Sequence, residues 1–166
     1  MSKSNPPAVT AVGILRLQAE HAYADLIVSL EGVTDGEAAA IPPTDGRGDL
    51  YCGPILGMMH HLAACKVMYA SAAFHGGEIA WNDCLARIQS LGTDLGAARE
   101  YLEEGQEYWL ASWSALPDSE LMADRSTNWG EIWPTWRIIH TITQHDAYHA
   151  GQIAAFRSML KPAENP

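Results

Sequence analysis

Two histidines four residues apart, His145 and His149, are the side chains of this 166-residue chain whose type and spacing first suggest chemistry. Within a helix, four residues make about one turn, so both imidazoles project from the same face. Neutral imidazoles presented in this way form half of a site for a divalent transition metal such as zinc, nickel or iron. Another element must supply the remaining ligands. The alternative is a pair of surface or hydrogen-bonded histidines.

The helix that carries this pair is predicted to begin near Pro134, which suits a first helical turn, and to end at about Lys161, before Pro162. Its core-facing stripe at three-and-four spacing consists of Ile138, Ile142, His145, His149, Gln152 and Phe156. An imidazole that is buried without a partner costs on the order of 1–3 kcal/mol. A bound metal would remove that cost.

A second helix with histidines is predicted from Pro54 to Gly76-Gly77, and Lys66 is almost its only charge. Such a helix should be mostly buried, so His60 and His61 need a partner or a ligand there. One of them could complete a set of three imidazoles, or could donate to a backbone carbonyl; helical spacing alone leaves the choice between them open. Cys65, one turn beyond His61, is a candidate fourth or inhibitory ligand, or simply a packed side chain.

Three histidines would leave coordination positions for water or substrate, whereas a structural site usually closes with four protein ligands. The chemistry expected of an open site is Lewis-acid activation: a lower pKa for a bound water or thiol, or polarisation of a carbonyl.

The remaining pattern predicts an all-α four-helix bundle in one domain, residues 1–166, with residues 1–7 as a flexible N-terminus. The first helix is expected over residues 8–30. A long loop follows to Gly53, with a helical turn at 35–40, and loops of this length can act as lids. The third helix is expected over residues 81–113, with an irregularity near Gly92 or Gly96. Strand signals are nearly absent.

Composition limits the function classes. The net charge is −10, with only ten Lys and Arg, so a phosphate backbone would be repelled over most of the surface and nucleic-acid binding is not expected. Three cysteines without CxxC spacing suit a reducing cytoplasm. The N-terminal residues resemble no signal peptide and no apolar run is long enough to span a membrane. We therefore expect a soluble, cytoplasmic protein.

Two segments carry a resemblance to a known family. His61-Leu62-Ala63, together with the block from His145 to Ile153, resembles the DinB-like (YfiT-related) superfamily, and the similarity extends from the first helix to about Leu160. Members are four-helix bundles with a divalent-metal site made by three such histidines. The resemblance implies that His61, His145 and His149 are the metal ligands and that His60 is a neighbour.

What the resemblance implies about activity is broad. Characterised relatives include bacillithiol-dependent S-transferases and a mycothiol-dependent maleylpyruvate isomerase, and many members have no assigned reaction. It implies an enzyme that activates a small thiol or water for a small-molecule substrate, with catalytic residues unassigned. Homodimers are common in such a family, although the sequence shows no exposed apolar patch that could be assigned to one.

Several neighbouring residues are weaker candidates. Asp146 and Gln152 could support the imidazoles, although Asp146 lies off their stripe. Tyr148 and His140 lie on an adjacent stripe, as structural or pocket-rim groups. The nearby tryptophans could wall an apolar pocket or pack in the bundle; they are Trp129, Trp133 and Trp136.

Two other functions compete with this one. The first is a zincin-like hydrolase, because the His145-Asp146-x-x-His149 segment resembles HExxH, although Asp is one methylene shorter than Glu and no third histidine follows. A di-iron bundle is disfavoured because its two Glu-x-x-His motifs are missing. The second is a non-catalytic bundle in which a metal only holds the helices together.

Overall fold

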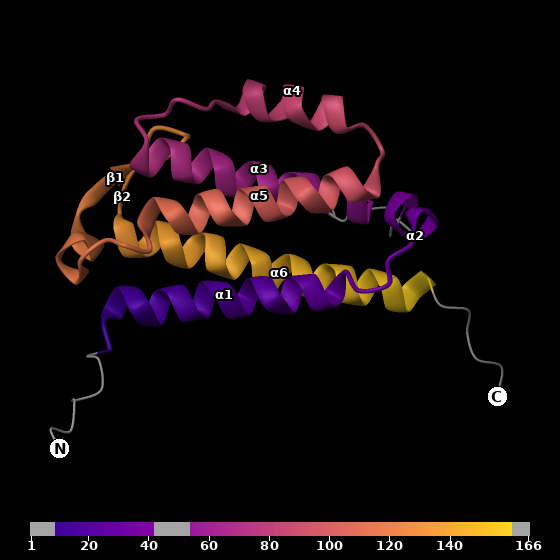
Figure 1. The fold of residues 1–166 in the computed structure, drawn as a ribbon, viewed down its shortest axis with the longest axis horizontal. Coiled ribbons are helices and arrows are strands. Elements are labelled where there is room, and N and C mark those ends of the chain that lie inside the picture. The colour runs from indigo at the N-terminus through magenta and orange to yellow at the C-terminus, as the bar shows by residue number, and fades with distance from the viewer. Residues whose placement is uncertain (1–8, 42–53, 161–166) are drawn as a thin grey trace, which may run out of the picture.

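The computed structural model describes residues 9–41 and 54–160. Four long helices form a bundle (Figure 1): α1 (Ala11–Ser29), α3 (Ile55–Phe74), α5 (Leu95–Trp113) and α6 (Thr135–Leu160). Helix α3 packs chiefly against α5, and α1 against α6. The predicted all-α bundle is therefore confirmed. None of the helices in the described segments combines the length and apolar character that a membrane crossing needs.

The N-terminus of α1 is capped by a neighbouring residue and by a residue far along the chain. The Thr10 hydroxyl accepts a hydrogen bond from the Gly13 amide at 2.9 Å, as an N-cap residue does. The Asp118 carboxylate, which belongs to the 3-10 helix η1 (Asp118–Met122), accepts from the amides of Ala11 and Val12, both at 2.9 Å. A carboxylate at a helix N-terminus also complements the helix dipole. This contact joins the beginning of α1 to the segment that precedes α6.

The helical turn expected after α1 is present as α2 (Asp35–Ala39). Thr34 and Glu37 form a capping box, in which each side chain accepts from the other residue's amide. Arg157 of α6 contacts the Glu37 carboxylate at 3.3 Å and donates to the carbonyls of Ser29 and Glu31. These contacts hold α2 against the end of α6. The rest of the predicted loop, residues 42–53, lies outside the described residues.

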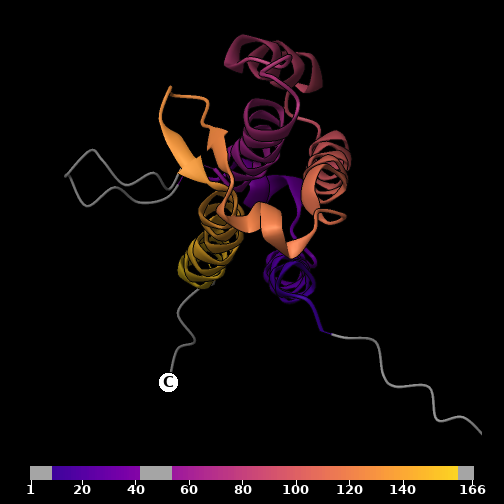
Figure 2. The ribbon, with the colours of Figure 1, turned by 90° about the vertical axis from the view of Figure 1, so that its left-hand side faces the viewer.

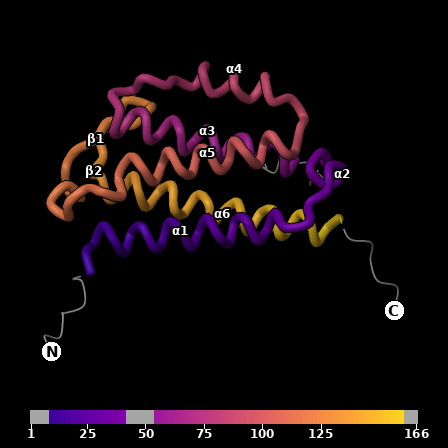
Figure 3. Tube along the Cα trace, viewed as in Figure 1, coloured from indigo at the N-terminus to yellow at the C-terminus, as the bar shows by residue number. Residues whose placement is uncertain are grey.

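The expectation of one helix over residues 81–113 is wrong. The segment contains two helices, α4 (Trp81–Leu91) and α5, and the irregularity expected near Gly92 is a reversal of the chain. Gly92 has a φ of 62°, which favours glycine, and the Asp94 side chain then caps α5 by accepting from Ala97 at 3.0 Å. Helix α4 runs along the outside of α3, so that α3 and α5 point in the same direction (Figures 1 and 3).

A small hairpin precedes α6, where only a loop was expected. Strands β1 (Asp124–Ser126) and β2 (Ile132–Pro134) pair antiparallel, with Arg125 opposite Trp133. The turn between them is closed by hydrogen bonds between Thr127 and Glu131. Figure 2 shows the hairpin at one end of the bundle, where β2 leads directly into α6.

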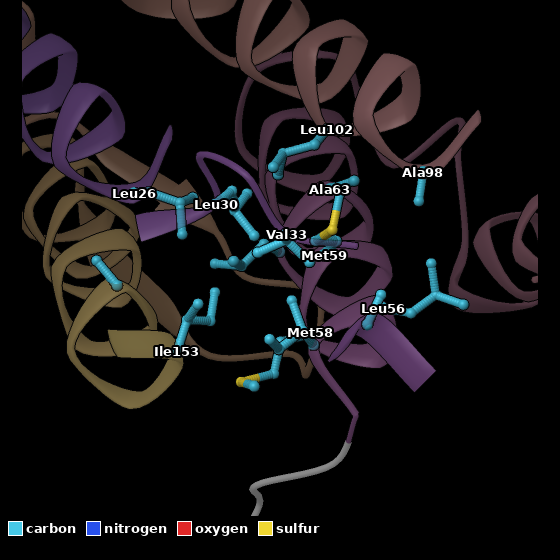
Figure 4. Close-up of a cluster of buried hydrophobic side chains, with 14 of the residues drawn as sticks. Leu26, Leu30, Val33, Leu56, Met58, Met59, Ala63, Ala98, Leu102 and Ile153 are labelled. Atoms are coloured by element: carbon cyan, nitrogen blue, oxygen red, sulfur yellow. The ribbon is translucent and has the colours of Figure 1, made fainter. Parts of the chain in front are cut away.

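Two large apolar clusters fill the bundle, and a third, smaller one contains Ala64, Met68 and Cys84. The first, near α2, contains Leu26, Leu30, Met59, Leu102 and Ile153 among others (Figure 4). The second lies toward the hairpin end and is built around Trp109, Trp113, Ile138, Ile139 and Ile142. Along α6, the residues between Ile142 of the second cluster and Ala150 of the first include both predicted histidines. A polar layer is thus expected between the two clusters.

Candidate metal centre

Three imidazoles converge between helices α3 and α6. The Nε2 atom of His145 lies 3.0 Å from Nε2 of His61 and 3.1 Å from Nε2 of His149. The His61 and His149 ring centroids are 5.3 Å apart. His60 is also buried, but no ring contact joins it to these three histidines, and its Nε2 has no hydrogen-bond partner among the described residues. The fold therefore brings His61, rather than His60, to the pair on α6.

Hydrogen bonding alone does not explain this arrangement well. A ring nitrogen of neutral histidine either donates one proton or presents one lone pair, so His145 Nε2 can satisfy only one of its two close neighbours. Nitrogen ligands about 2.1 Å from one ion, at angles of roughly 90–110°, lie about 3.0–3.4 Å from each other. The two Nε2 separations agree with that range, so the residues present fit a divalent metal.

A thiol lies beside the imidazoles. The Sγ atom of Cys65 is 3.7 Å from both ring nitrogens of His61. His61, Cys65 and His145 each present one potential ligand atom, and these atoms lie within 4.8 Å of one another. A group of two histidines and one cysteine can therefore hold a metal ion.

The sequence profile of the DinB superfamily matches residues 18–153, which include all four of these side chains. The chain belongs to the DinB superfamily. The resemblance seen in the two histidine segments is thereby confirmed at the level of the family. No curated protein matches the chain significantly.

Burial keeps the imidazoles of this DinB-superfamily protein neutral. Desolvation, followed by the charges of the neighbouring rings, lowers the pKa of His145 to about 3 and that of His149 to about 4. Burial also lowers the pKa of His61. All three rings should be unprotonated near neutral pH, and unprotonated imidazole is the form that binds metals. Burial raises the pKa of Cys65 to about 12, against a smaller opposite effect of Lys66, so without a metal the thiol keeps its proton.

A buried ion pair lies next to the candidate metal centre. Lys66 of α3 donates to the Asp146 carboxylate of α6, and the two residues are only 1% and 2% exposed. The Lys66 ammonium also lies 5.3 Å from the centroid of the Tyr23 ring of α1. Asp146 thus faces the core and contacts Lys66. Lys66 was not predicted to have a role, although a lone charge in so apolar a helix was a usable signal.

The other candidates lie around the rim. Gln152 donates to the Tyr148 hydroxyl at 2.8 Å, and its hydrogen bond with His149 opposes the effect of burial on the pKa of that ring. His140 is exposed, and its ring centroid is 6.3 Å from that of Trp136. His140 and Trp136 have no ring contact with the three converging imidazoles.

An open pocket of about 370 Å³ reaches the candidate metal centre at His61, Cys65 and His145. Its lining is mainly apolar and aromatic and consists of His61, Cys65, Tyr69, Thr141, Ile142, Gln144, His145 and Tyr148. Trp129 stacks edge-on against Tyr69 at 5.3 Å, and Trp133 against Trp129 at 5.0 Å. Two of the three predicted tryptophans therefore support the pocket wall from behind. A larger pocket, of about 440 Å³, lies between the end of α3 and the hairpin and contains none of the histidines.

Proposed function

We propose that this member of the DinB superfamily is a metal-dependent enzyme that activates a small thiol or a water molecule, as a thiol S-transferase or a hydrolase does. The observation that carries the proposal is the convergence of three neutral imidazoles beside an open pocket, whose wall includes two of them, His61 and His145. Burying polar imidazoles costs free energy unless each finds a partner or a ligand. Because the pocket reaches the cluster from solvent, a metal held there could also bind a substrate.

In this proposal His61, His145 and His149 hold a divalent zinc, nickel or iron ion. Their rings come from two helices and are fixed by core packing, which keeps the three Nε2 atoms in place before a ligand arrives. Such an ion acts as a Lewis acid: it lowers the pKa of a bound thiol or water. The preferred partner is a low-molecular-weight thiol together with an electrophilic small molecule.

The pocket wall has two tasks in such a reaction. Its apolar part, which includes Ile142 and the rings of Tyr69 and Tyr148, excludes water and binds the apolar body of a substrate. Burial raises the pKa of Tyr69 to about 12, with a smaller contribution from Cys65, so the hydroxyl remains protonated. It can therefore donate a hydrogen bond to a substrate oxygen.

The surroundings of Asp146 speak against a zincin-like mechanism. That mechanism needs the carboxylate between the two histidines to act on a water at the metal. Asp146 instead contacts Lys66 in the core and is not part of the pocket lining. A non-catalytic metal-binding bundle is the second candidate, and the observation that favours it is Cys65, a potential fourth protein ligand that would close the site.

The test for the ligands is metal content. Purified wild-type protein should carry close to one equivalent of metal, and His61→Ala, His145→Ala and His149→Ala should each lose most of it. His60→Ala is the matched control, because this neighbouring histidine is buried on the same helix but lies outside the cluster. Full occupancy in all three cluster variants would refute the site, and loss of metal in His60→Ala alone would refute the choice of His61.

The test for activity is a screen of the metal-loaded protein with electrophilic substrates and several small thiols, each with and without metal removal. Turnover that depends on the metal, in a protein whose apo-form stays folded, supports an enzyme. An apo-protein that unfolds, with no turnover for any substrate pair, would instead support the non-catalytic bundle.

A further inference from the structure

Cys65 lies one helical turn after His61, so both side chains project from the same side of α3. The two residues also line the same pocket, together with His145 of α6. The Cys65 side chain is only 7% exposed, and the sulfur points toward the imidazoles rather than into solvent. Its position is thus part of the cluster and not merely part of the core.

The distances suit coordination by sulfur. A metal with a sulfur ligand at about 2.3 Å and a nitrogen ligand at about 2.1 Å, at a tetrahedral angle, keeps the two ligand atoms about 3.5–3.6 Å apart. The sulfur of Cys65 lies 3.7 Å from Nε2 of His61, the same distance as from Nδ1, and within 4.8 Å of the ligand atom of His145. Cys84, the other buried cysteine of the described residues, gives a contrast: its sulfur contacts the carbonyl of Ala64 at 3.9 Å, and it belongs neither to the pocket lining nor to the group with His61 and His145.

We infer that Cys65 is a fourth protein ligand of the metal centre, and that an external thiol must displace it to bind. This inference rests on the proposed function, because it takes His61, His145 and His149 as the other ligands. When the Cys65 sulfur–metal bond forms, the thiol releases its proton to solvent through the open pocket. When an external thiol displaces Cys65, the bond from the metal to the Cys65 sulfur breaks as the bond to the new sulfur forms; the incoming thiol loses a proton and the released Cys65 thiolate takes one up, and no oxidant or reductant is involved. Four protein ligands would close the coordination in the resting protein.

This arrangement would make Cys65 an internal competitor for the position that a substrate thiol takes. A soft sulfur ligand beside imidazoles also favours zinc over harder ions that prefer oxygen ligands. The resting protein should therefore be protected from adventitious thiols at low concentration. It should respond to a thiol only when that thiol competes successfully with the Cys65 sulfur.

Cobalt substitution tests the ligand directly, because a thiolate ligand gives Co²⁺ an intense near-ultraviolet charge-transfer absorption. Wild-type protein loaded with Co²⁺ should show this absorption and Cys65→Ala should lose it, while Cys65→Ala still binds one Co²⁺ at least tenfold more weakly. Cys84→Ala, and Cys52→Ala outside the described residues, should retain the absorption. Wild-type protein that binds Co²⁺ without this absorption would overturn the inference but leave the histidine site standing. Protein that binds no Co²⁺ would overturn both.

A measurement on unmodified protein covers the case in which Cys65→Ala fails to fold. X-ray absorption of zinc-loaded wild-type protein should show one sulfur scatterer at about 2.3 Å among nitrogen scatterers. A shell of nitrogen and oxygen alone would refute the inference.

Titration with 2-mercaptoethanol tests the competition. In Co²⁺-loaded Cys65→Ala, the added thiol should restore the charge-transfer absorption. The concentration required should be at least tenfold lower than the concentration that changes the spectrum of Cys84→Ala. Equal thiol dependence in the two variants would show that Cys65 does not occupy the position of the incoming thiol.

Discussion

Replacement of Lys66 by methionine gives the most direct test of how the bundle positions its site. Lys66 and Asp146 form an ion pair between α3 and α6, and both side chains are almost completely buried. Methionine fills a similar volume, so Lys66→Met removes the charge without leaving a large cavity. The Asp146 carboxylate then remains in the core without its partner. Loss of one member of a buried pair typically destabilises a protein by about 3–5 kcal/mol.

The expected loss is near the lower end of that range, because desolvation already raises the pKa of Asp146 and the orphaned carboxyl can take up a proton. We therefore expect Lys66→Met to lower the free energy of unfolding by about 3 kcal/mol. Asp146→Leu, which leaves the Lys66 ammonium unpaired, should also be destabilised by a few kcal/mol. The double variant, Lys66→Met with Asp146→Leu, leaves no buried charge and should be more stable than either single variant.

Urea unfolding of the metal-free proteins, followed by circular dichroism, measures these differences, and metal must be removed because ligand binding adds its own stability. The two single variants and the double variant form a thermodynamic cycle that isolates the interaction of the pair. Single-variant losses below about 1 kcal/mol, or a double variant that loses the sum of both, would refute a strongly coupled buried pair.

Two further predictions concern packing and pH. A methyl group added at Gly105 would lie 3.0 Å from the backbone oxygen of Ala63, so Gly105→Ala should lose about 1–3 kcal/mol in urea unfolding. Gly151→Ala is the control: nothing lies within 4 Å of the added methyl, and the variant should gain up to about 1 kcal/mol from helix propensity. Equal effects of the two substitutions would contradict close packing of α3 on α5. In metal-free protein the pKa values of His145 and His149, about 3 and 4, lie below the ordinary value, so the unfolded state binds protons first as the pH falls. The free energy of unfolding should therefore decrease from about pH 6.5 toward pH 4.5, and less steeply in His145→Gln. A free energy of unfolding that does not change over this pH range would contradict neutral buried rings.

The sequence was sufficient to predict α1, α3 and α6 and the faces that carry the histidines, because helical periodicity encodes which side of a helix is buried. His145 and His149 share a face simply because they are four residues apart. Pro134 marked the start of α6 to within a residue. That a histidine of α3 meets those of α6 followed from burial, since an apolar helix in a bundle must lie against its neighbours. The choice of His61 over His60 came from the family resemblance, because helical spacing leaves it open.

Three other features of the structure could not be predicted, because the local sequence gives too little indication of them. The apolar residues of α4 and α5 both follow helical spacing, so the pattern predicted one continuous helix. The chain reverses at Gly92, whose φ is positive. The hairpin before α6 has strands of three residues each, too short for an alternating pattern to appear. The partnership of Lys66 with Asp146 joins positions 80 residues apart, and no periodicity within one helix predicts such a contact.

The ion pair and the candidate metal centre are connected by their places on the helices. Cys65 and Lys66 are consecutive on α3, and His145 and Asp146 are consecutive on α6. Consecutive residues point about 100° apart around a helix axis, so each helix directs one side chain to the pocket and the next one to the core. The ion pair therefore restrains the rotation of both helices about their axes. An imidazole nitrogen about 6 Å from its axis would move about 2 Å for a rotation of 20°, enough to break a coordination bond. The double variant of Lys66 and Asp146 should consequently unfold at near wild-type urea concentrations, yet bind metal more weakly. Wild-type metal affinity in that variant would show that apolar packing alone aligns the ligands.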